Sequence, residues 1–334
     1  MHDQFAREFS RDPAVVELDL SSADNQAFTG GVGGEVSLRD DITDAELRAF
    51  GERVREFAVD HDTRVLGSAG PSNVRISVLF DGWRVPVLLD EAQGDALLDA
   101  TKELRGDSRV DAVVFNSVEF TTVVDSATIE IADGDTAFAM LAESPGLFAQ
   151  LAPSPTLTVT TQPGAAARVV LAGAPGPWLG SARAAYDGLT AELALTGFEA
   201  DQEAATITLA NEADLARAEA LARAALQGST LAVTFQSDLV TLFPGATGGA
   251  ARALLAELPE NARAALESVW TDDRALKLGA TDTAAVAALA RAIDGAGAGG
   301  AGGGAEPLSP VTIHTGDQSE PALSIQGAPG QLVA

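Results

Sequence analysis

The sequence predicts an α+β protein of about three tandem ferredoxin-like units, each with the order β-α-β-β-α-β, an antiparallel sheet and helices on one face. First, strand-like and helix-like hydrophobic periods alternate in this order along the chain. Second, the length of 334 residues predicts two or three domains. Third, an apolar–polar–apolar triplet precedes a helix by a few residues at Val36–Leu38, Ile129–Ile131, Ile207–Leu209 and Leu276–Leu278. This recurrence indicates internal duplication.

The first predicted unit has the clearest pattern. Glu35–Leu38 alternates as a strand does, and Thr43 followed by Glu46 matches the capping box that starts a helix. The helix is expected to end near His61. Its apolar face is formed by residues at three- and four-residue steps, Leu47, Phe50, Val54 and Phe57.

A hairpin is predicted next. The strand Asn73–Phe80 leads into Asp81-Gly82, a dipeptide that accepts the positive φ angles of a tight turn. Pro86 in the return strand indicates an edge strand or a bulge, because proline has no N–H to donate. A helix and a strand complete the unit, at Glu91–Leu104 and Val110–Phe115.

The second unit repeats the order. Its first strand includes Thr128–Ile131, and the helix from Asp135 is expected to break in two at Pro145. A hairpin, a helix and a closing strand follow, at Thr156–Thr161 with Arg168–Leu171, Trp178–Tyr186 and Ala191–Leu195.

The third unit is less regular. A helix and the strand Thr230–Phe235 follow Thr206–Leu209, and Leu239–Phe243 is either a hairpin strand or a short helix. Two helical pieces separated at Pro259 are predicted to reach about Trp270. A closing strand and an added helix are expected at Ala275–Leu278 and around Val286, Leu289 and Ile293.

The predicted organisation has five parts. Residues 1–34 hold an N-terminal strand, Val15–Leu20, and a glycine-rich connection. The three ferredoxin-like units occupy residues 35–118, 125–198 and 203–294. Residues 295–334 are predicted to be a flexible glycine-rich linker and tail, because this composition buries too little apolar surface to order itself.

Composition and charge exclude several functional classes. The chain has 48 acidic and 21 basic residues, and its net charge of −27 repels phosphate backbones, so no nucleic-acid partner is expected. The absence of cysteine excludes disulfides, thiol catalysis and cysteine–metal sites. No apolar run is long enough to span a bilayer, so no direct membrane insertion is expected from these residues.

One loop has a pattern that fits phosphate binding. Phe243–Ala250 is rich in glycine and opens a helix, so the N–H groups of Gly245–Gly249 are candidates to cradle an anion, with Arg252 as the nearby cation. The lysine and hydroxyl of a P-loop are absent, and so is the spacing of a dinucleotide fingerprint. A structural loop at a helix start is therefore the favoured interpretation.

The other candidate residues have structural interpretations, and no catalytic, cofactor or metal residue is assigned. The glycines of Thr29–Gly34 lead into a strand, where no helix dipole faces a ligand. Trp83 is either an exposed anchor for a partner or part of the core. Several acids resemble metal ligands or acid/base pairs, but they also stand where a carboxylate would cap a helix or a turn. The three histidines are far apart in sequence. These acids and histidines are Asp40, Asp41, Asp44, Asp133, Asp135, Asp272, Asp273, His2, His61 and His314.

The N-terminal part of the chain resembles a group of bacterial proteins. Within Ala14–Glu56, the first strand, the connection Phe28-Thr29-Gly30 and the helix start Asp44-Ala45-Glu46-Leu47 resemble uncharacterised exported or membrane-anchored envelope proteins of high-GC actinobacteria. The resemblance implies an extracytoplasmic location, with anchoring through an N-terminal segment that is missing here. It implies no activity and no cofactor.

Three functions stay open. The leading hypothesis is non-catalytic binding or scaffolding in the bacterial cell envelope, with a protein or another envelope component as partner. The second is a cytoplasmic regulatory module that binds a small molecule between paired sheets. The third is an enzyme that acts on a phosphorylated substrate through Gly245–Arg252, and it is the least favoured because no reactive cluster accompanies the loop.

Overall fold

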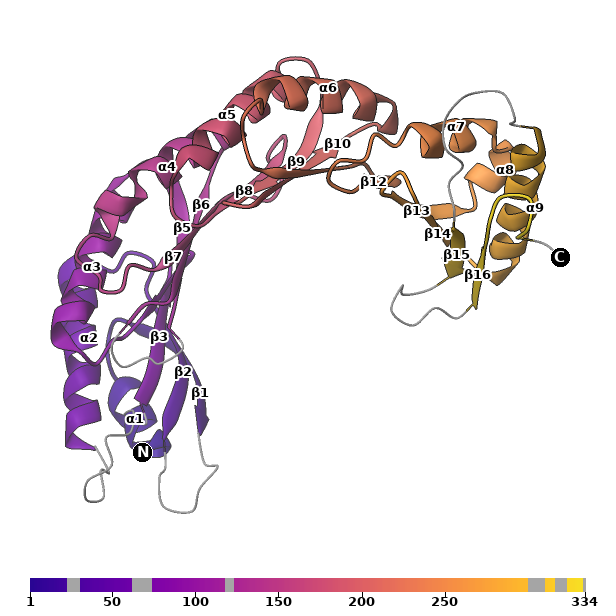
Figure 1. Cartoon of the computed structure of the whole chain (residues 1–334). Coiled ribbons are helices and arrows are strands. Elements are labelled where there is room, and N and C mark those ends of the chain that lie inside the picture. The colour runs from indigo at the N-terminus through magenta and orange to yellow at the C-terminus, as the bar shows by residue number, and fades with distance from the viewer. Residues whose placement is uncertain (23–30, 62–73, 118–122, 300–309, 316–322, 333–334) are drawn as a thin grey trace, which may run out of the picture. The chain divides into compact units, whose positions relative to one another are not determined.

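The computed structural model describes residues 1–22, 31–61, 74–117, 123–299, 310–315 and 323–332 (Figure 1). The chain divides into two compact units, Met1–Pro175 and Gly176–Ala334. The fold is α+β, as predicted. The proposed boundaries of three ferredoxin-like units stay a prediction.

Within the described residues, the first unit has four helices and eight strands. In chain order they are α1 (His2–Phe9), β1 (Val15–Ser22), β2 (Val32–Leu38), α2 (Asp44–Asp60), β3 (Val74–Phe80), β4 (Trp83–Pro86), α3 (Glu91–Gly106), β5 (Val110–Asn116), β6 (Ser126–Ile131), α4 (Gly134–Leu147), β7 (Thr156–Thr161) and β8 (Arg168–Ala172).

The described part of the second unit has five α-helices, eight strands and a 3₁₀ turn at Glu212–Asp214. The helices and strands are α5 (Pro177–Thr190), β9 (Leu195–Ala200), β10 (Ala204–Leu209), α6 (Leu215–Ala225), β11 (Ala232–Gln236), β12 (Val240–Leu242), α7 (Gly249–Glu257), α8 (Glu260–Arg263), β13 (Leu266–Thr271), β14 (Leu276–Ala280), α9 (Thr283–Gly299), β15 (Val311–Thr315) and β16 (Leu323–Gly327).

Strands that follow each other in sequence are neighbours in the sheet, from β1 to β8 in the first unit and from β9 to β16 in the second. Hairpin partners are antiparallel, as in β3 and β4, where Phe80 lies opposite Trp83. Strands joined by a helix are parallel, as in β2 and β3, where Val36 lies opposite Val78. The sheet of each unit is therefore mixed, and the prediction of antiparallel sheets is wrong.

The pairing order also differs from that of a ferredoxin-like unit, in which another strand lies between the two strands of a split βαβ element. Here α2, α3, α4, α6 and α9 each join two adjacent parallel strands. Tandem ferredoxin-like units are thus not confirmed, and the element that recurs is a β-hairpin followed by a helix. Hydrophobic periodicity predicts the order of elements, but strand partners depend on contacts between distant residues.

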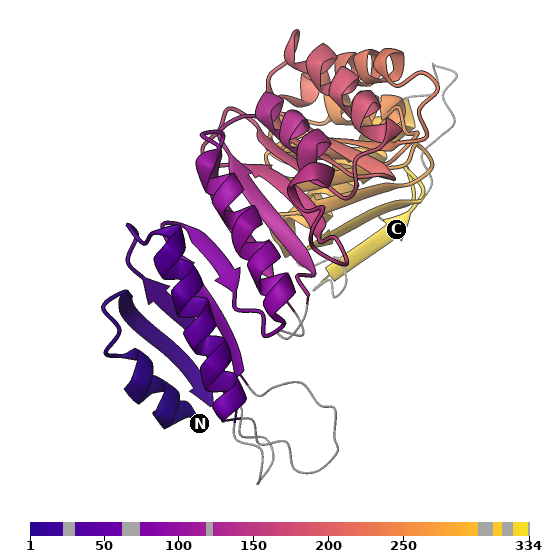
Figure 2. The ribbon, with the colours of Figure 1, turned by 90° about the vertical axis from the view of Figure 1, so that its left-hand side faces the viewer.

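Helices cover one face of the sheet in the first unit, as Figure 2 shows for α2 and α3. The predicted apolar face of α2 is confirmed, because its four residues are buried. Helix α1 adds Phe5 and Phe9, whose rings make edge contacts with Phe57 at 5.1 and 5.9 Å between centroids. Side chains on the other face of the sheet, such as Thr158 and Thr160, stay partly exposed.

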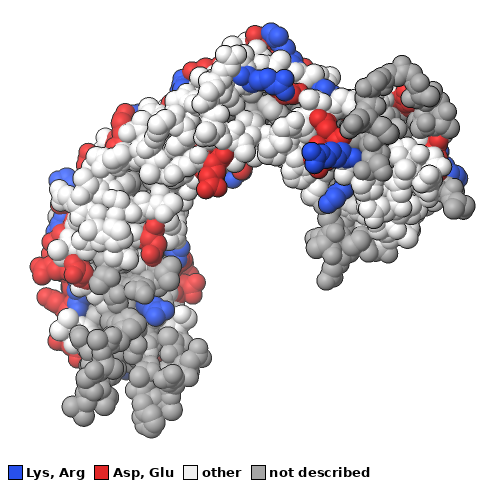
Figure 3. Space-filling view, viewed as in Figure 1, with Lys and Arg blue, Asp and Glu red and all other residues white. Residues whose placement is uncertain are grey.

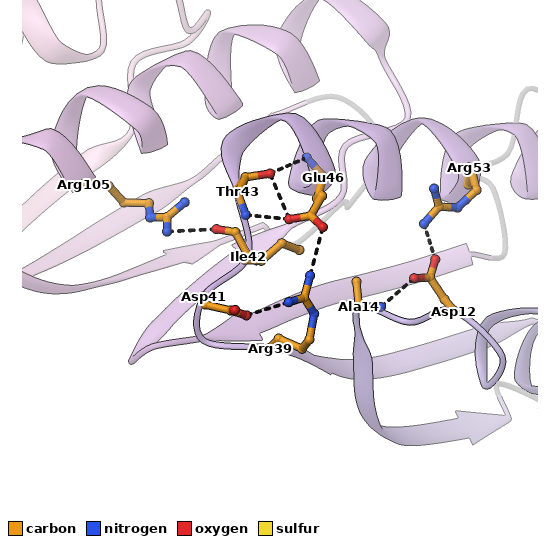
Figure 4. A network of polar contacts seen from close by, with 9 residues as sticks. All are labelled: Asp12, Ala14, Arg39, Asp41, Ile42, Thr43, Glu46, Arg53 and Arg105. Atoms are coloured by element: carbon orange, nitrogen blue, oxygen red, sulfur yellow. Dashed lines mark hydrogen bonds and ion pairs between the residues drawn. The ribbon is translucent and has the colours of Figure 1, made fainter.

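The start of α2 confirms the predicted capping box (Figure 4). The Glu46 N–H donates to the Thr43 hydroxyl at 3.2 Å, and the Thr43 N–H donates to Glu46 Oε2 at 2.9 Å. Arg39 donates to Glu46 Oε1 at 2.9 Å, and Arg105 of α3 donates to the Ile42 carbonyl at 3.1 Å. The Thr43 N–H, above all, holds the pKa of Glu46 below its usual value.

Two predictions about proline are wrong. Helix α4 continues through Pro145 to Leu147 instead of breaking. The Ser144 hydroxyl donates to the Leu141 carbonyl at 2.7 Å, which supplies the bond that proline cannot make. Pro86 is expected in an edge strand or at a bulge, but β4 has β3 and β5 as neighbours and pairs with β3 without a register shift up to Pro86.

The third predicted unit needs further corrections. Leu239–Phe243 contains the short strand β12, which decides between its two interpretations. The helical pieces end at Arg263, and Trp270 belongs to strand β13. In the second predicted ferredoxin-like unit, residues 125–198, the closing strand starts at Leu195 and not at Ala191. The predicted tail contains two described strands, β15 and β16, and residues 300–309 and 316–322 lie outside the described chain.

Candidate functional site

The glycine-rich loop connects β12 to α7 in the second unit. Gly245 and Gly248 have positive φ angles of 85° and 62°. Gly248 is the N-cap of α7, and a Cβ atom built there would lie 2.6 Å from Leu242 Cδ2. The left-handed backbone conformation favours glycine at position 248, whether or not a ligand binds.

The N–H groups of this loop bind a carboxylate from the same chain. Asp273, between β13 and β14, accepts the N–H groups of Thr247 and Gly248, the second at 2.7 Å. Arg252 donates to the Thr247 carbonyl at 2.8 Å. The groups expected to cradle a phosphate thus already have an anionic partner, which favours the structural interpretation of the loop.

A cavity of about 220 Å³ lies beside the loop, between α6, β11 and Gly245. The exposed Arg223 pairs with Glu219 where these side chains line the cavity. The remaining wall is mostly apolar and is formed by Ala222, Leu226, Leu231, Val233, Phe235 and Ala246. The cavity thus combines an apolar wall with a charged pair, as sites for small molecules often do.

Phe243 and Trp270 form an aromatic pair, with ring centroids 6.3 Å apart and ring planes at 81°. Phe243 is 43% exposed. Because side chains alternate along a strand, Thr241 and Phe243 face away from the buried Val240 and Leu242. Phe243 is therefore exposed and Trp270 partly exposed, and the pair offers aromatic surface to a partner. No local pattern in the sequence indicates this pair, because only strand register brings the two residues together.

The acidic candidates bind N–H groups and arginines. Asp133 caps α4 and accepts the Thr136 N–H at 2.9 Å, and Asp135 lies in the first turn of this helix. The Ala275 N–H donates to Asp272 and contributes most to lowering the pKa of that carboxyl. Asp40, Asp41 and Asp44 bind the Asp81 N–H, Arg39 and Arg105, respectively. The capping interpretation is confirmed for Asp133, and Asp44 and Asp135 lie in the first turns of α2 and α4. It is wrong for Asp40 and Asp41, because the N-cap of α2 is Thr43.

The histidines stand in three different settings. His2 contacts Asp3 at 3.0 Å, and a ring nitrogen of His61 lies 2.9 Å from the Phe57 carbonyl oxygen. His314 is buried in β15. Trp83 is 4% exposed and belongs to the core, so its interpretation as an exposed anchor is wrong.

The first glycine-rich segment is explained by strand packing at its C-terminal end. Gly34, in β2, has a φ of 143°, and a Cβ atom there would lie 2.1 Å from the Asp19 carbonyl oxygen. Only glycine permits this approach of β2 to β1. Thr29 and Gly30 lie outside the described residues.

Ion pairs join neighbouring helices of the first unit. Arg109 contacts Asp107 at 2.7 Å and Glu143 of α4 at 2.6 Å, and its hydrogen bonds lower the pKa of both carboxyls. Arg48 of α2 contacts Asp95 and Asp99 of α3, both at 2.7 Å. Figure 3 shows charged side chains along this helical side of the unit. The Arg48 pairs tie α2 to α3, and Arg109 ties the turn after α3 to α4, so these four carboxylates are all paired with arginine.

Comparisons with family models, with curated proteins and with solved structures found no match. Within the described ranges, no group of three or more metal-ligating side chains converges on one point. The same part of the chain contains no helix with the length and apolarity to cross a membrane.

Proposed function

We propose that this chain is a non-catalytic binding or scaffolding protein of the bacterial cell envelope, whose recurring modules present an extended binding surface. Its partner is a component of the envelope. The recurring modules in this proposal are the repeated hairpin–helix elements, and they replace the tandem ferredoxin-like modules expected from the sequence.

The observation that carries the binding part of the proposal is the aromatic pair of Phe243 and Trp270. Phe243, 43% exposed beside Trp270, retains apolar surface area in contact with water. Burial of this area against a partner would stabilise the complex by about 25 cal/mol for each Å² removed from water. Aromatic residues of this kind dominate the energetics of many interfaces. The surrounding sheet face supplies the partly exposed area that a binding surface needs.

The proposal that the protein is non-catalytic is supported by the structural roles of its candidate acids. The sequence candidates Asp41, Asp44, Asp133 and Asp273 bind arginines or cap helix N-termini. Envelope location is supported by the resemblance of Ala14–Glu56 to exported proteins.

Fractionation of the producing cells tests the location, with an antibody against the purified chain. We expect the protein in the envelope fraction. Recovery only in the cytoplasmic fraction would contradict the envelope assignment. Immobilised chain incubated with isolated envelopes then tests binding, and we expect one envelope component to be retained by the wild type and released on loss of Phe243.

A cytoplasmic regulatory module is the second candidate, and the 220 Å³ cavity beside α6 is the observation that favours it. A small apolar molecule bound there would stabilise the native state by mass action. Thermal-shift screening of nucleotides, amino acids and short fatty acids tests this candidate. A shift that disappears in Ala222→Trp, which fills the cavity, would support it over the envelope proposal.

A further inference from the structure

We infer that the open sheet face of the second unit is a binding site for a neutral, linear polysaccharide, held along a row of side chains centred on Trp270. This inference rests on the proposed function and specifies the chemical class of the partner. The row begins at Gln236 in β11 and crosses six strands to Gln326 in β16.

Strand register places the members of the row directly side by side. Successive Cα partners across β11–β16 are Gln236, Thr241, Trp270, Lys277, Thr312 and Gln326. With neighbouring strands 4.7–4.9 Å apart, five spacings extend over about 24 Å. The row is thus long enough for several units of a polymer lying across the strands.

All members of the row face away from the helices. The residues on either side along β14, Leu276 and Leu278, are fully buried, whereas Lys277 is exposed. Trp270 stands in the same way beside the buried Val269 and Thr271. Because side chains alternate between the two faces of a strand, the row lies on the open face.

The chemistry of the row matches that of a sugar chain. The rings of Trp270 and Phe243 offer faces with partial negative charge to the C–H groups of a pyranose ring. Threonine hydroxyls, glutamine amides and the Lys277 ammonium supply donors and acceptors for sugar hydroxyls on both sides of the aromatic pair. Gln236 is already oriented, because its Nε2 donates to Thr208 Oγ1 at 2.8 Å.

Two other partner classes fit less well. The centre of a protein interface is typically enriched in aromatic residues, methionine and arginine. Here Phe243 is the aromatic neighbour of Trp270, and the rest of the row consists of glutamine, threonine and lysine. A polyanion would meet a chain with a net charge of −27, and Lys277 is the one cation in the row. A neutral glycan meets neither difficulty.

Titration of the whole chain with cellohexaose, maltohexaose and N-acetylchitohexaose tests the inference, with oligogalacturonate as the anionic comparator. We expect saturable binding of at least one neutral hexasaccharide, followed by calorimetry and by tryptophan fluorescence. The fluorescence change reports on Trp270, because Trp83 and Trp178 are only 4% and 9% exposed.

Matched variants locate the site. Phe243→Ser and Trp270→Ala are expected to weaken binding about tenfold, Trp270→Phe less, and Lys277→Gln about threefold. Lys102→Gln removes the other lysine of the chain, and Val59→Ser removes an apolar side chain that is 74% exposed on α2. Both controls are expected to bind as the wild type does. Phe243→Ser changes an exposed residue and keeps the test valid if Trp270→Ala folds poorly.

Three results would overturn the inference: no binding of the neutral hexasaccharides, tighter binding of oligogalacturonate, or wild-type binding by Phe243→Ser and a folded Trp270 variant. The proposed function fails separately. If the wild type still retains an envelope protein while no hexasaccharide binds, the binding function stands and the glycan assignment is wrong. If the sugars bind but the protein is recovered only in the cytoplasmic fraction, the glycan assignment stands and the envelope assignment is wrong.

Discussion

Several residues of this chain are fixed by the space and the hydrogen-bond donors around them. Gly34 permits β1 to approach β2, and Gly248 permits α7 to start against Leu242. Asp273 accepts the N–H groups of Thr247 and of Gly248, the two residues that precede α7. The two glycine-rich segments, which suggest ligand binding in the sequence, are thus explained by close backbone packing and by a carboxylate of the same chain.

Replacing Gly34 with alanine should destabilise the first unit by about 3 kcal/mol, because the added Cβ meets the Asp19 carbonyl and φ is positive. Gly33→Ala is the matched control, since its Cβ has no neighbour closer than 3.6 Å. Urea unfolding of both variants measures the difference. Equal stability of the two variants would contradict the packing argument.

Asp273→Asn should lower the free energy of unfolding by about 1 kcal/mol, because it removes a charge-assisted cap but keeps the shape of the side chain. Glu257→Gln, on the exposed C-terminal turn of α7, is the control and should be neutral. If Asp273→Asn instead gains phosphate affinity without loss of stability, the loop is an anion site that Asp273 blocks. Calorimetry with inorganic phosphate decides between these outcomes.

At the scale of elements, helix starts follow local rules and strand pairs do not. The capping box of α2 lies where Thr43 and Glu46 predicted it, and Asp133 caps α4. Pro145 violates the local expectation because the Ser144 hydroxyl replaces the missing donor. Leu266–Thr271 forms β13 instead of the predicted helix because it pairs with β12 and β14, and its last three residues, Val269, Trp270 and Thr271, are of types that favour strands.

The capping box should make stability depend on pH. Hydrogen bonds lower the pKa of Glu46 in the folded state, so its contribution is present above the unfolded value of 4.5 and is lost as the pH falls through the lower folded value. Glu46→Gln should therefore be less stable than the wild type at pH 7 and approach it near pH 3. Denaturant unfolding at both pH values checks this, with Glu52→Gln on the same helix as control. A gap that widens in acid would refute the assignment.

Thr43→Ala removes the other half of the box and should cost about 1 kcal/mol at pH 7. The loss arises because the Glu46 N–H loses its acceptor. Thermal unfolding of this variant provides the measurement, and Thr43→Ser should retain most of the stability. A serine variant as unstable as the alanine variant would argue against a capping role.

For the molecule as a whole, the excess of acidic over basic residues dominates the electrostatic free energy. A net charge of −27 destabilises the compact state through self-repulsion, and salt screens it. The melting temperature should therefore rise between 0.01 and 0.3 M sodium chloride at pH 7, from a screening length of about 30 Å to less than 10 Å. Near the sequence pI of 4.2 the rise should disappear. Scanning calorimetry at the two pH values tests this, and a melting temperature that falls with salt at pH 7 would show that ion pairs such as Arg48 with Asp95 dominate instead.

The α+β class, the alternation of strands and helices, the start of α2 and the overall acidity can be predicted from the sequence, because periodicity, capping and charge are properties of neighbouring residues. The folded chain was needed to show that consecutive strands pair in sequence order, that Trp83 is buried, and that Asp273 binds the N–H groups of the glycine loop. It alone placed Trp270 between Thr241 and Lys277. Register between strands depends on distant contacts and on the burial of one face, and no single segment of the chain encodes either.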